Sequence, residues 1–434
     1  MRCLITGGAG FIGSHLVEHL VGAGHDVVVL DDLSTGHREN FAAVRRRISF
    51  MRGSVADLST CRRAMEGVDY VLHHAAVTSV QRSVDDPGSA HTVNATGTLN
   101  VLLAAHDARV RRVVYAGSTS AYGGSTVLPN SEEHVAHPLG PYAAAKLAGE
   151  GYCLAFHAAY GLETVVLRYF NVFGPRQDPK SQYAAVVPRF IAAALAGEPP
   201  TIYGDGSQTR DFVYVANVVH ANLLATRAPA ARVAGQVFNV GCGRSMSVNE
   251  LWDRVRGLTG VPVLPRHEAA RAGEVKSSLA SITKARELVG YQPEVDLDEG
   301  LRRPNEWDVL ACVLRRSEQL RLRFFERTHP VGGTPFHRLK YHPRRRRETQ
   351  ERSDLGQFAG GVLDHILVPQ QQESRPAMTG CEPAGHMLSP RSVKGSLTRN
   401  ESPHVFGERI LIGDQLTLAL KMVLRDHDIP RVAD

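Results

Sequence analysis

The feature that most constrains this chain is an alternation of apolar, strand-length runs with helix-length segments over about its first 170 residues. The runs read RCLITG, DVVVLD, YVLHHAA, RVVYAGS and ETVVLRYFN, and helices are expected over residues 14–22, over 94–107 and from Tyr142 onward. Strands that are apolar on both faces are typical of a parallel sheet covered by helices. The pattern therefore predicts an α/β fold with a doubly wound parallel sheet.

A second, smaller α/β domain is expected over residues 171–305, above the strand ends where open sheets bind their ligands. Prolines and the segment YGDGSQTRD break this region into shorter elements. Over residues 306–434 the periodicity is lost and polar, Pro/Gly/Ser-rich stretches appear, which predicts an atypical, partly disordered extension. Within it, residues 408–427 are expected to form a strand and an amphipathic helix. An altered reading frame or a fusion is an open alternative for the extension.

Charge and cysteine content limit the expected partners. The net charge is +6, but much of the basic excess lies late in the chain, in RLKYHPRRRRETQER. A short charge run is usually a solvated surface, so no nucleic acid is expected as a partner. The six cysteines are scattered without CxxC spacing, which favours free thiols and no metal site. The chain has neither a secretory signal pattern nor a membrane-spanning apolar run, so a soluble, cytoplasmic protein without membrane insertion is expected.

The segment LITGGAGFIGSHL places Gly7, Gly10 and Gly13 between the first strand and the first helix. Glycine permits the tight turn and lets the backbone approach a pyrophosphate, whose charge the N–H groups at the helix start can bind. Asp31 ends the next strand, where a carboxylate binds an adenosine ribose and repels a 2′-phosphate. These residues predict a Rossmann-type domain over residues 1–170 with NAD, rather than NADP, as cofactor. A structural turn with a capping aspartate is the alternative.

A catalytic set is predicted from Ser118, Tyr142 and Lys146. Tyr142 and Lys146 are four residues apart on an expected helix and so share one face. A tyrosine ionises near pH 10, so it acts as a base at neutral pH only if a nearby cation stabilises its phenolate. Ser118 ends a predicted sheet strand and offers a hydroxyl to the substrate oxygen. An alanine-rich helix with an incidental tyrosine is the alternative.

From Met1 to about Glu306 the sequence resembles the extended short-chain dehydrogenase/reductases, specifically the nucleotide-sugar 4-epimerases of the UDP-glucose 4-epimerase type. The motifs that carry the resemblance include TGGAGFIGSHL, NATGTLNVL, PYAAAKLAGE, RYFNVFGPRQDP and GDGSQTRDFVYV. The resemblance implies that the Tyr142 phenolate takes the proton from the sugar 4-hydroxyl while hydride passes to NAD. The 4-keto sugar then turns over and receives hydride on its other face. The resemblance also implies a homodimer built on the helices that begin near Asn94 and Tyr142.

The resemblance further assigns roles by position. Ser118 would bind the 4-oxygen, and Lys146 would bind the nicotinamide ribose and depress the pKa of Tyr142. Tyr203 would stack on uracil, and two forked guanidinium groups, those of Arg210 and Arg271, would bind the diphosphate. The implied cofactor-binding set is Gly7, Gly10, Phe11, Ile12, Gly13, Asp31, Asp32, Ser54, Val55, Ala75, Asn94, Tyr142, Lys146 and Tyr169. The implied UDP-sugar-binding set is Thr78, Ser118, Asn171, Val187, Tyr203, Arg210, Arg271 and Ser278.

Two positions bear on the reaction and the substrate. Related 4,6-dehydratases and decarboxylases carry acids just after the serine or threonine, whereas this chain has Thr119 and Ser120, which favours simple epimerisation. Ser278 stands where a bulky residue narrows the pocket in enzymes restricted to unacetylated sugars. A small residue there leaves room for an acetamido group, so UDP-N-acetylglucosamine is expected as a substrate together with UDP-glucose.

Departures from the family pattern keep other functions open. Ser54 and Ser281 stand where aspartates are usual, and the first of these predicts weakened cofactor affinity. A dehydratase, a decarboxylase or a one-way dehydrogenase on a similar nucleotide sugar is one alternative. A non-catalytic NAD-binding sensor or scaffold is another.

Overall fold

The computed structural model describes residues 1–178, 185–270 and 275–303, all of which belong to one compact unit of the chain. The predicted extension over 306–434, including the elements expected at 408–427, lies outside the described residues. So does Arg271, one of the two arginines assigned to the diphosphate. None of the helices in the described ranges is long and apolar enough to cross a membrane.

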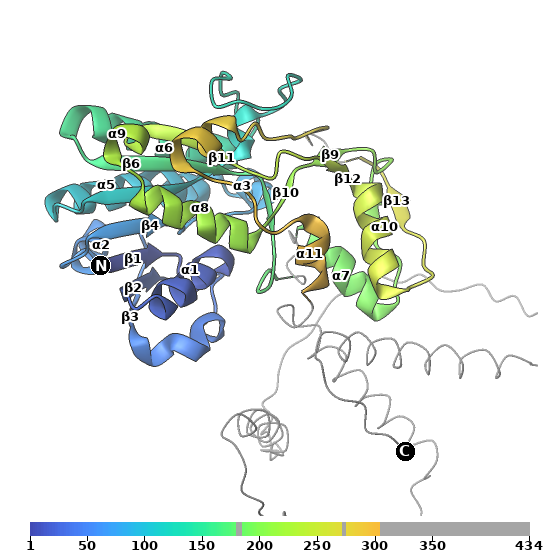
Figure 1. Cartoon of the computed structure of the whole chain (residues 1–434), viewed down its shortest axis with the longest axis horizontal. Coiled ribbons are helices and arrows are strands. Elements are labelled where there is room, and N and C mark those ends of the chain that lie inside the picture. Colours follow the sequence, from blue (N-terminus) through green and yellow to red (C-terminus); the bar gives the residue numbers. More distant parts are fainter. Residues whose placement is uncertain (179–184, 271–274, 304–434) are drawn as a thin grey trace, which may run out of the picture. The chain divides into compact units, whose positions relative to one another are not determined.

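The centre of the fold is a seven-stranded sheet in which every neighbouring pair is parallel (Figure 1). In spatial order its strands are β11 (Gln236–Val240), β6 (Glu163–Tyr169), β5 (Arg112–Ser118), β4 (Tyr70–His73), β1 (Arg2–Thr6), β2 (Asp26–Asp31) and β3 (Ile48–Arg52). The chain runs outward from β1 to β3 and returns to β4 on the other side of β1. Ligands of open α/β sheets bind at the carboxyl ends of the strands beside such a reversal. The predicted doubly wound fold is confirmed.

Helices cover both faces of this sheet. They are α1 (Phe11–Gly22), α2 (Leu58–Ala64), α3 (Val80–Asp85), α4 (Pro87–His91), α5 (Gly97–Asp107), α6 (Pro141–Tyr160), α8 (Val215–Arg227) and α9 (Ala230–Val233), with short turns η1 (Arg38–Arg47), η2 (Thr92–Thr96), η3 (Thr119–Tyr122) and η4 (Ala285–Val289). Because side chains alternate along a strand, Ile5 joins a core with α1 and α8, whereas its neighbour Leu4 joins a core with α2, α5 and α6. Because the strands bury side chains on both faces, their sequences are continuous apolar runs.

A third core holds the smaller elements. These are β7 (Asn171–Phe173) with β10 (Phe212–Tyr214), β8 (Thr201–Tyr203) with β13 (Arg266–Glu268), β9 (Thr209–Arg210) with β12 (Met246–Ser247), and the helices α7 (Val186–Ala196), α10 (Val248–Thr259) and α11 (Leu297–Arg302). Phe190 of α7 packs edge-to-face on Trp252 of α10, with ring centroids 5.4 Å apart. A capping box between Ser247 and Glu250 fixes the start of α10.

The division into domains at residue 170 stays a prediction, and the main sheet itself extends past it. β11 pairs with β6, and α8 packs in the core beside α1, although both lie within the range predicted for the second domain. Without β11 the backbone groups of β6 would form an open sheet edge, which is costly to leave uncovered. The chain therefore leaves the main sheet after β6 and returns to complete it.

The helix expected over residues 94–107 differs in detail. Residues Thr92–Thr96 form the π-helical turn η2, and the regular helix α5 begins only at Gly97. Asn94, within this π-helical turn, is buried. Its side-chain oxygen accepts the backbone N–H of Val77 at 2.8 Å, and its side-chain nitrogen donates to the carbonyl of Val77 at 3.0 Å. Such π-turns are frequent at functional sites, and a 3.6-residue pattern does not reveal them.

Candidate active site

The turn between β1 and α1 leaves a cradle that only glycine can form. Gly7 has a φ of +68°, and a Cβ atom there would lie 2.7 Å from the backbone nitrogen of Ala75. A Cβ atom on Gly13 would lie 2.1 Å from the carbonyl oxygen of Gly7. Gly10 is the N-cap of α1, whose start has neither a side-chain cap nor an acidic residue in the first turn. An uncapped helix start in a glycine-lined turn suits a pyrophosphate, so these residues fit the predicted dinucleotide.

Asp31, at the end of β2, is tied to this turn. Its Oδ2 atom accepts a hydrogen bond from the backbone N–H of Ala9 at 2.9 Å, and Oδ1 accepts one from Leu33 at 2.8 Å. Burial raises the pKa of this carboxyl group, and the two backbone donors act in the opposite direction. Asp32 is exposed and accepts the N–H of Ser34. The structure thus places the predicted ribose-binding carboxylate beside the glycine turn.

The loop after β4 is held by a buried chain of hydrogen bonds that sequence reasoning missed. Thr6 Oγ1 accepts the N–H groups of Ala75 and of the residue before it, both at 3.1 Å, so its own proton goes to Nδ1 of His73, 2.6 Å away. His73 therefore carries its proton on Nε2 and donates to Thr98 Oγ1 at 3.0 Å, and Thr98 donates to the carbonyl of Asn94 at 2.7 Å. Burial lowers the pKa of His73 well below its usual value, so the ring is neutral. The chain links Ala75 to Asn94, two predicted cofactor positions.

The remaining predicted cofactor positions vary in what their side chains contact. Ser54 accepts the N–H of Ala56 at 3.3 Å, and Val55 is buried in the core with α5. Phe11 and Ile12 begin α1 and pack partly against the third core. The Tyr169 hydroxyl lies in the interior, bonded to His74 Nε2 at 2.9 Å and to Asn222 at 2.8 Å, and its role toward the cofactor stays a prediction.

Ser118 and Tyr142 come together where β5 ends and α6 begins. Pro141 occupies the first turn of α6, a position at which its missing N–H costs nothing. The backbone N–H of Tyr142 donates to Ser83 Oγ of α3 at 3.0 Å, which anchors the helix start. Ser118 is the N-cap of η3 and accepts the N–H of Ser120 at 3.1 Å. The Ser118 hydroxyl lies close enough to the Tyr142 side chain to lower its pKa.

Lys146 lies one helical turn beyond Tyr142 and is buried. Its Nζ atom donates to the carbonyl oxygen of Ala116 at 2.8 Å and lies 4.9 Å from the ring centre of Tyr115. Burial lowers the pKa of Lys146 to about 8. Burial raises the pKa of Tyr142, and the nearby Ser118 hydroxyl partly offsets this. In the chain alone Tyr142 is therefore protonated at neutral pH, and its activation needs further positive charge nearby.

Several predicted UDP-sugar positions gather near β9. Ser278 donates its backbone N–H to the carbonyl of Thr209 at 3.1 Å, which brings it beside Arg210. Arg210 Nη1 donates to the carbonyl oxygen of Thr209 at 2.8 Å. Ser278 is buried, and its Oγ atom has no hydrogen-bond partner among the described residues. Tyr203, on β8, has the guanidinium of Arg189 at 5.8 Å from its ring centre.

Three further positions are less clearly directed toward a substrate. Asn171 begins β7 and donates its N–H to the carbonyl of Asp211 at 3.0 Å. Thr78 is exposed in the loop before α3. The side chain of Val187 is buried in the third core, where it packs among α7 and α10. These assignments, like the rest of the site, stay predictions.

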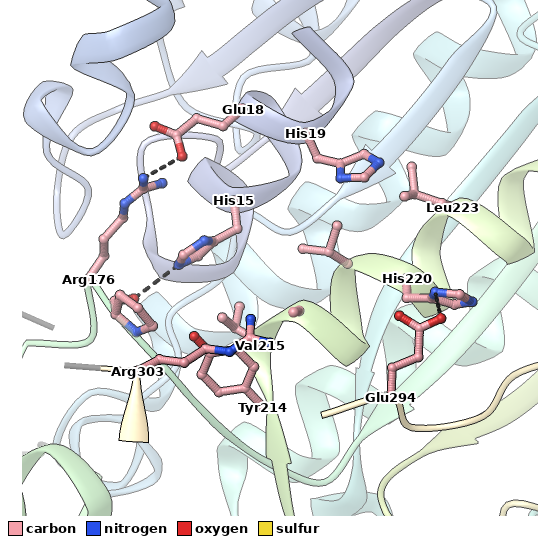
Figure 2. Close-up of a pocket in the computed structure, with 13 residues that line it drawn as sticks. His15, Glu18, His19, Arg176, Tyr214, Val215, His220, Leu223, Glu294 and Arg303 are labelled. Carbon is pink, nitrogen blue, oxygen red and sulfur yellow. Dashed lines mark hydrogen bonds and ion pairs between the residues drawn. The ribbon is translucent and has the colours of Figure 1, made fainter. Parts of the chain in front are cut away.

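A cavity of about 580 Å³ lies elsewhere, between α1, α8 and the loop after β7 (Figure 2). It is lined by the ion pair between Glu18 and Arg176 and by a contact of 3.1 Å between Nδ1 of His220 and Oε1 of Glu294. None of the predicted site residues lines this cavity. Within the described ranges, no three His, Cys, Asp or Glu side chains are arranged to hold a metal ion.

A glycine-lined turn at the sheet reversal, with a tyrosine–lysine helix and a serine at the same edge, defines an enzyme of the extended short-chain dehydrogenase/reductase class. Residues 3–241, more than half of the chain, match the model of the NAD dependent epimerase/dehydratase family. The chain belongs to this family, and NAD is its cofactor.

Individual relatives agree. A UDP-glucose 4-epimerase of Mycolicibacterium smegmatis is 42% identical over 311 residues, which cover 71% of this chain and 98% of the relative. The crystal structure of the UDP-glucose 4-epimerase of Thermotoga maritima with UDP-glucose matches with a TM-score of 0.67 at 39% identity, covering 74% and 100% of the two chains. A UDP-N-acetylglucosamine 4-epimerase of Methanobrevibacter ruminantium, solved with UDP-N-acetylmuramic acid, matches with a TM-score of 0.67 at 36% identity, covering 71% and 98%.

Proposed function

We propose that this protein is an NAD-dependent UDP-sugar 4-epimerase that interconverts UDP-glucose with UDP-galactose and UDP-N-acetylglucosamine with UDP-N-acetylgalactosamine. The observation that carries the proposal is that Ser118 and Tyr142 lie close together at the carboxyl edge of the sheet, with Lys146 buried one turn along α6. Relatives with 4-epimerase names support the same reaction.

The residues act on the sugar 4-hydroxyl as a base and a hydrogen-bond donor. When bound, NAD supplies a hydride acceptor and donor for carbon 4. Tyr142 removes the 4-hydroxyl proton and returns it after the 4-keto sugar has turned over, while Ser118 holds the 4-oxygen. Lys146, turned from the carbonyl of Ala116 toward the ribose, adds the positive charge that lowers the pKa of Tyr142.

The substitution of hydroxyl groups for acids after Ser118 supports epimerisation over elimination or decarboxylation. Thr119 and Ser120 begin η3, and their hydroxyl groups do not ionise near neutral pH, so they cannot serve as the general acid those reactions need. Dehydratase or decarboxylase activity remains the alternative within the family, which includes dehydratases by name.

The acetylated substrate is proposed from Ser278. Its small side chain is buried beside Arg210 and leaves one polar atom unpartnered within the described residues. We propose that this small side chain admits an acetamido substituent and offers it a hydroxyl group. We further propose a cytoplasmic homodimer through α5 and α6, to be checked by light scattering; α6 carries exposed Tyr152 and Tyr160 on its surface.

A Tyr142→Phe substitution tests whether the protein is an enzyme or a cofactor sensor. It removes the base but keeps the ring, so epimerisation should fall by about 10²-fold or more while bound NAD remains stoichiometric. Turnover is followed by NMR of the sugar anomeric proton, and NAD content by absorbance after denaturation. Unchanged turnover in the variant would contradict the assigned role of Tyr142.

A further inference from the structure

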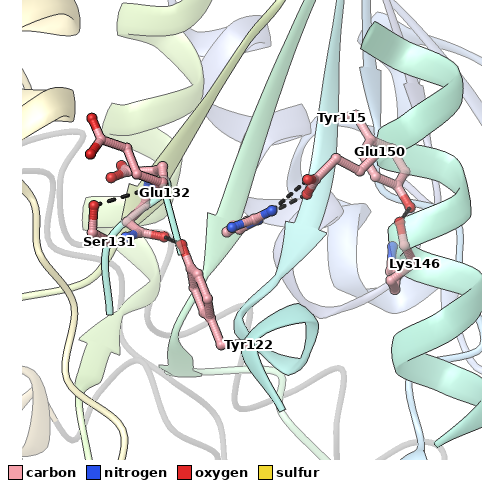
Figure 3. Close-up of polar contacts among 9 residues, drawn as sticks. Tyr115, Tyr122, Ser131, Glu132, Lys146 and Glu150 are labelled. Carbon is pink, nitrogen blue, oxygen red and sulfur yellow. Dashed lines mark hydrogen bonds and ion pairs between the residues drawn. The ribbon is translucent and has the colours of Figure 1, made fainter. Parts of the chain in front are cut away.

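A buried ion pair joins the catalytic helix to the sheet. Glu150 lies one turn beyond Lys146 on α6, and its carboxylate accepts two hydrogen bonds from Arg168 of β6, at 2.9 Å from Nε and 2.5 Å from Nη2 (Figure 3). The two side chains are only 6% and 5% exposed. Replacing a buried ion pair by apolar residues is often neutral or stabilising, so a pair kept at this depth calls for a reason other than stability.

The pair continues toward Ser118 through an aromatic ring. The guanidinium of Arg168 lies 4.7 Å from the ring centre of Tyr122, which ends η3, the turn that Ser118 caps. The Tyr122 hydroxyl donates to Oδ1 of Asn239, in β11, at 2.7 Å (Figure 3). The α6 helix is thereby linked across β6 to the far edge of the sheet.

Asn239 then reaches the substrate side. Its amide donates to the carbonyls of Asn130 at 3.0 Å and Ser281 at 3.1 Å. Asn130 also exchanges backbone hydrogen bonds with residues 279 and 281, at 2.7 and 2.8 Å. The network therefore runs without a break from the helix of Tyr142 to the segment that carries Ser278.

We propose that Glu150, Arg168, Tyr122 and Asn239 form a positioning network that fixes Tyr142 and Ser118 relative to the UDP-sugar segment around Ser278. This inference rests on the proposed function. The ion pair and the hydrogen bonds of the network are directional, so the network sets the position of α6 along β6, which apolar packing alone does not specify as sharply. A misplacement of about 1 Å at reacting atoms can cost about 10²-fold in rate.

The test is a double-mutant cycle with Glu150→Gln, Arg168→Met and both together. The matched control is Glu163→Gln, which breaks a second pair, Arg112–Glu163, at the opposite end of β5 and β6. We expect each network variant to lower kcat about tenfold with KM for UDP-glucose changed less than about twofold, and the double variant to be no worse than either single one. Glu163→Gln should lower the melting temperature but leave kcat within about twofold.

The pH midpoint of Tyr142 ionisation distinguishes a positioning role of the network from a purely electrostatic or purely structural one. It is measured by ultraviolet difference titration of the NAD-bound protein against the Tyr142→Phe variant, which needs no turnover. Displacement of Tyr142 from Ser118 should raise the midpoint in all three variants, because the nearby Ser118 hydroxyl lowers the pKa of Tyr142. If the proposed reaction is wrong, wild-type turnover is absent while this titration still reports on the network.

Two results would overturn the inference. Midpoint shifts of opposite sign in Glu150→Gln and Arg168→Met that cancel in the double variant would mean that the pair acts only through its charges. Melting temperatures that fall while kcat and the midpoint stay at wild-type values would mean a structural role alone. If the ion-pair variants do not fold, Tyr122→Phe, which removes only the bond to Asn239, is put through the same two measurements with the same expected directions.

Discussion

Tyr142 and Lys146 experience the same burial with opposite consequences. Burial favours the neutral form of each, so the pKa of Tyr142 rises and that of Lys146 falls to about 8. The Lys146 ammonium is held by a backbone carbonyl, and no carboxylate of the described residues forms an ion pair with it. Its positive charge therefore stays available to stabilise a phenolate.

The substitution Lys146→Met tests how much the buried charge of Lys146 destabilises the folded protein. The pKa of Lys146 is about 8 in the folded protein and about 10.4 when unfolded, so the unfolded state binds more protons between these values. Below pH 8 the buried charge destabilises the wild type, on the order of 3 kcal/mol, and this cost disappears as pH rises to about 10.5. The free energy of unfolding of the wild type should therefore rise relative to the variant over that range. Urea titrations without added nucleotide measure it, and a pH-independent difference would contradict the burial of a charged Lys146.

Ser278→Tyr tests the proposed substrate range. A bulky side chain at this buried position should lower kcat/KM for UDP-N-acetylglucosamine by about 10- to 200-fold relative to UDP-glucose. The steric fit of one small substituent in a pocket typically changes the ratio of kcat/KM values by about this factor. Ser278→Ala is the control and should retain both activities. Equal losses for the two sugars in Ser278→Tyr would show that this residue does not set the choice.

Sequence reasoning located residues whose positions follow from a short motif. It missed contacts between residues that lie far apart in the sequence. Gly7, Gly13 and Asp31 follow from strand–turn–helix spacing, and the structure places them together. The chain from Thr6 through His73 to Thr98, and the pair of Glu150 with Arg168, join residues from separate elements, so no spacing rule indicates them. A polar residue within an otherwise apolar strand, such as Thr6 or Arg168, is the one signal available.

At the scale of elements, the two ends of α1 differ in how tightly their glycines are packed. Its first turn is shaped by close backbone contacts, whereas a Cβ atom added to Gly22, at its end, would meet no neighbouring atom within 4 Å. We therefore expect a glycine-to-alanine substitution to have different effects at Gly13 and at Gly22.

Gly13→Ala should weaken NAD binding by about 10²-fold or more and destabilise the fold, because the new Cβ atom would lie 2.1 Å from the carbonyl oxygen of Gly7. Gly22→Ala should keep NAD affinity and add up to about 1 kcal/mol of stability. Calorimetric NAD titration and thermal melts of both variants provide the comparison. Normal NAD affinity in Gly13→Ala would contradict the cradle.

For the whole molecule, the alternation of strands and helices predicted the sheet but not its strand order. The return of β11 to the edge of β6 depends on which unpaired edge remains after β6, a property of the assembled sheet. The same return brings Asn239 to Tyr122, and so connects the segment around Ser278 to α6. The proposed network thus joins residues separated by much of the described chain.

The central claim is tested most directly by incubating the purified full-length protein with NAD and, separately, with UDP-glucose and UDP-N-acetylglucosamine, and following the anomeric proton signals by NMR. The account predicts that the galacto epimer of each sugar appears and approaches equilibrium, without loss of water or carbon dioxide and without net release of NADH. Stable bound NAD with no epimer from either sugar, or a dehydrated product, would contradict it.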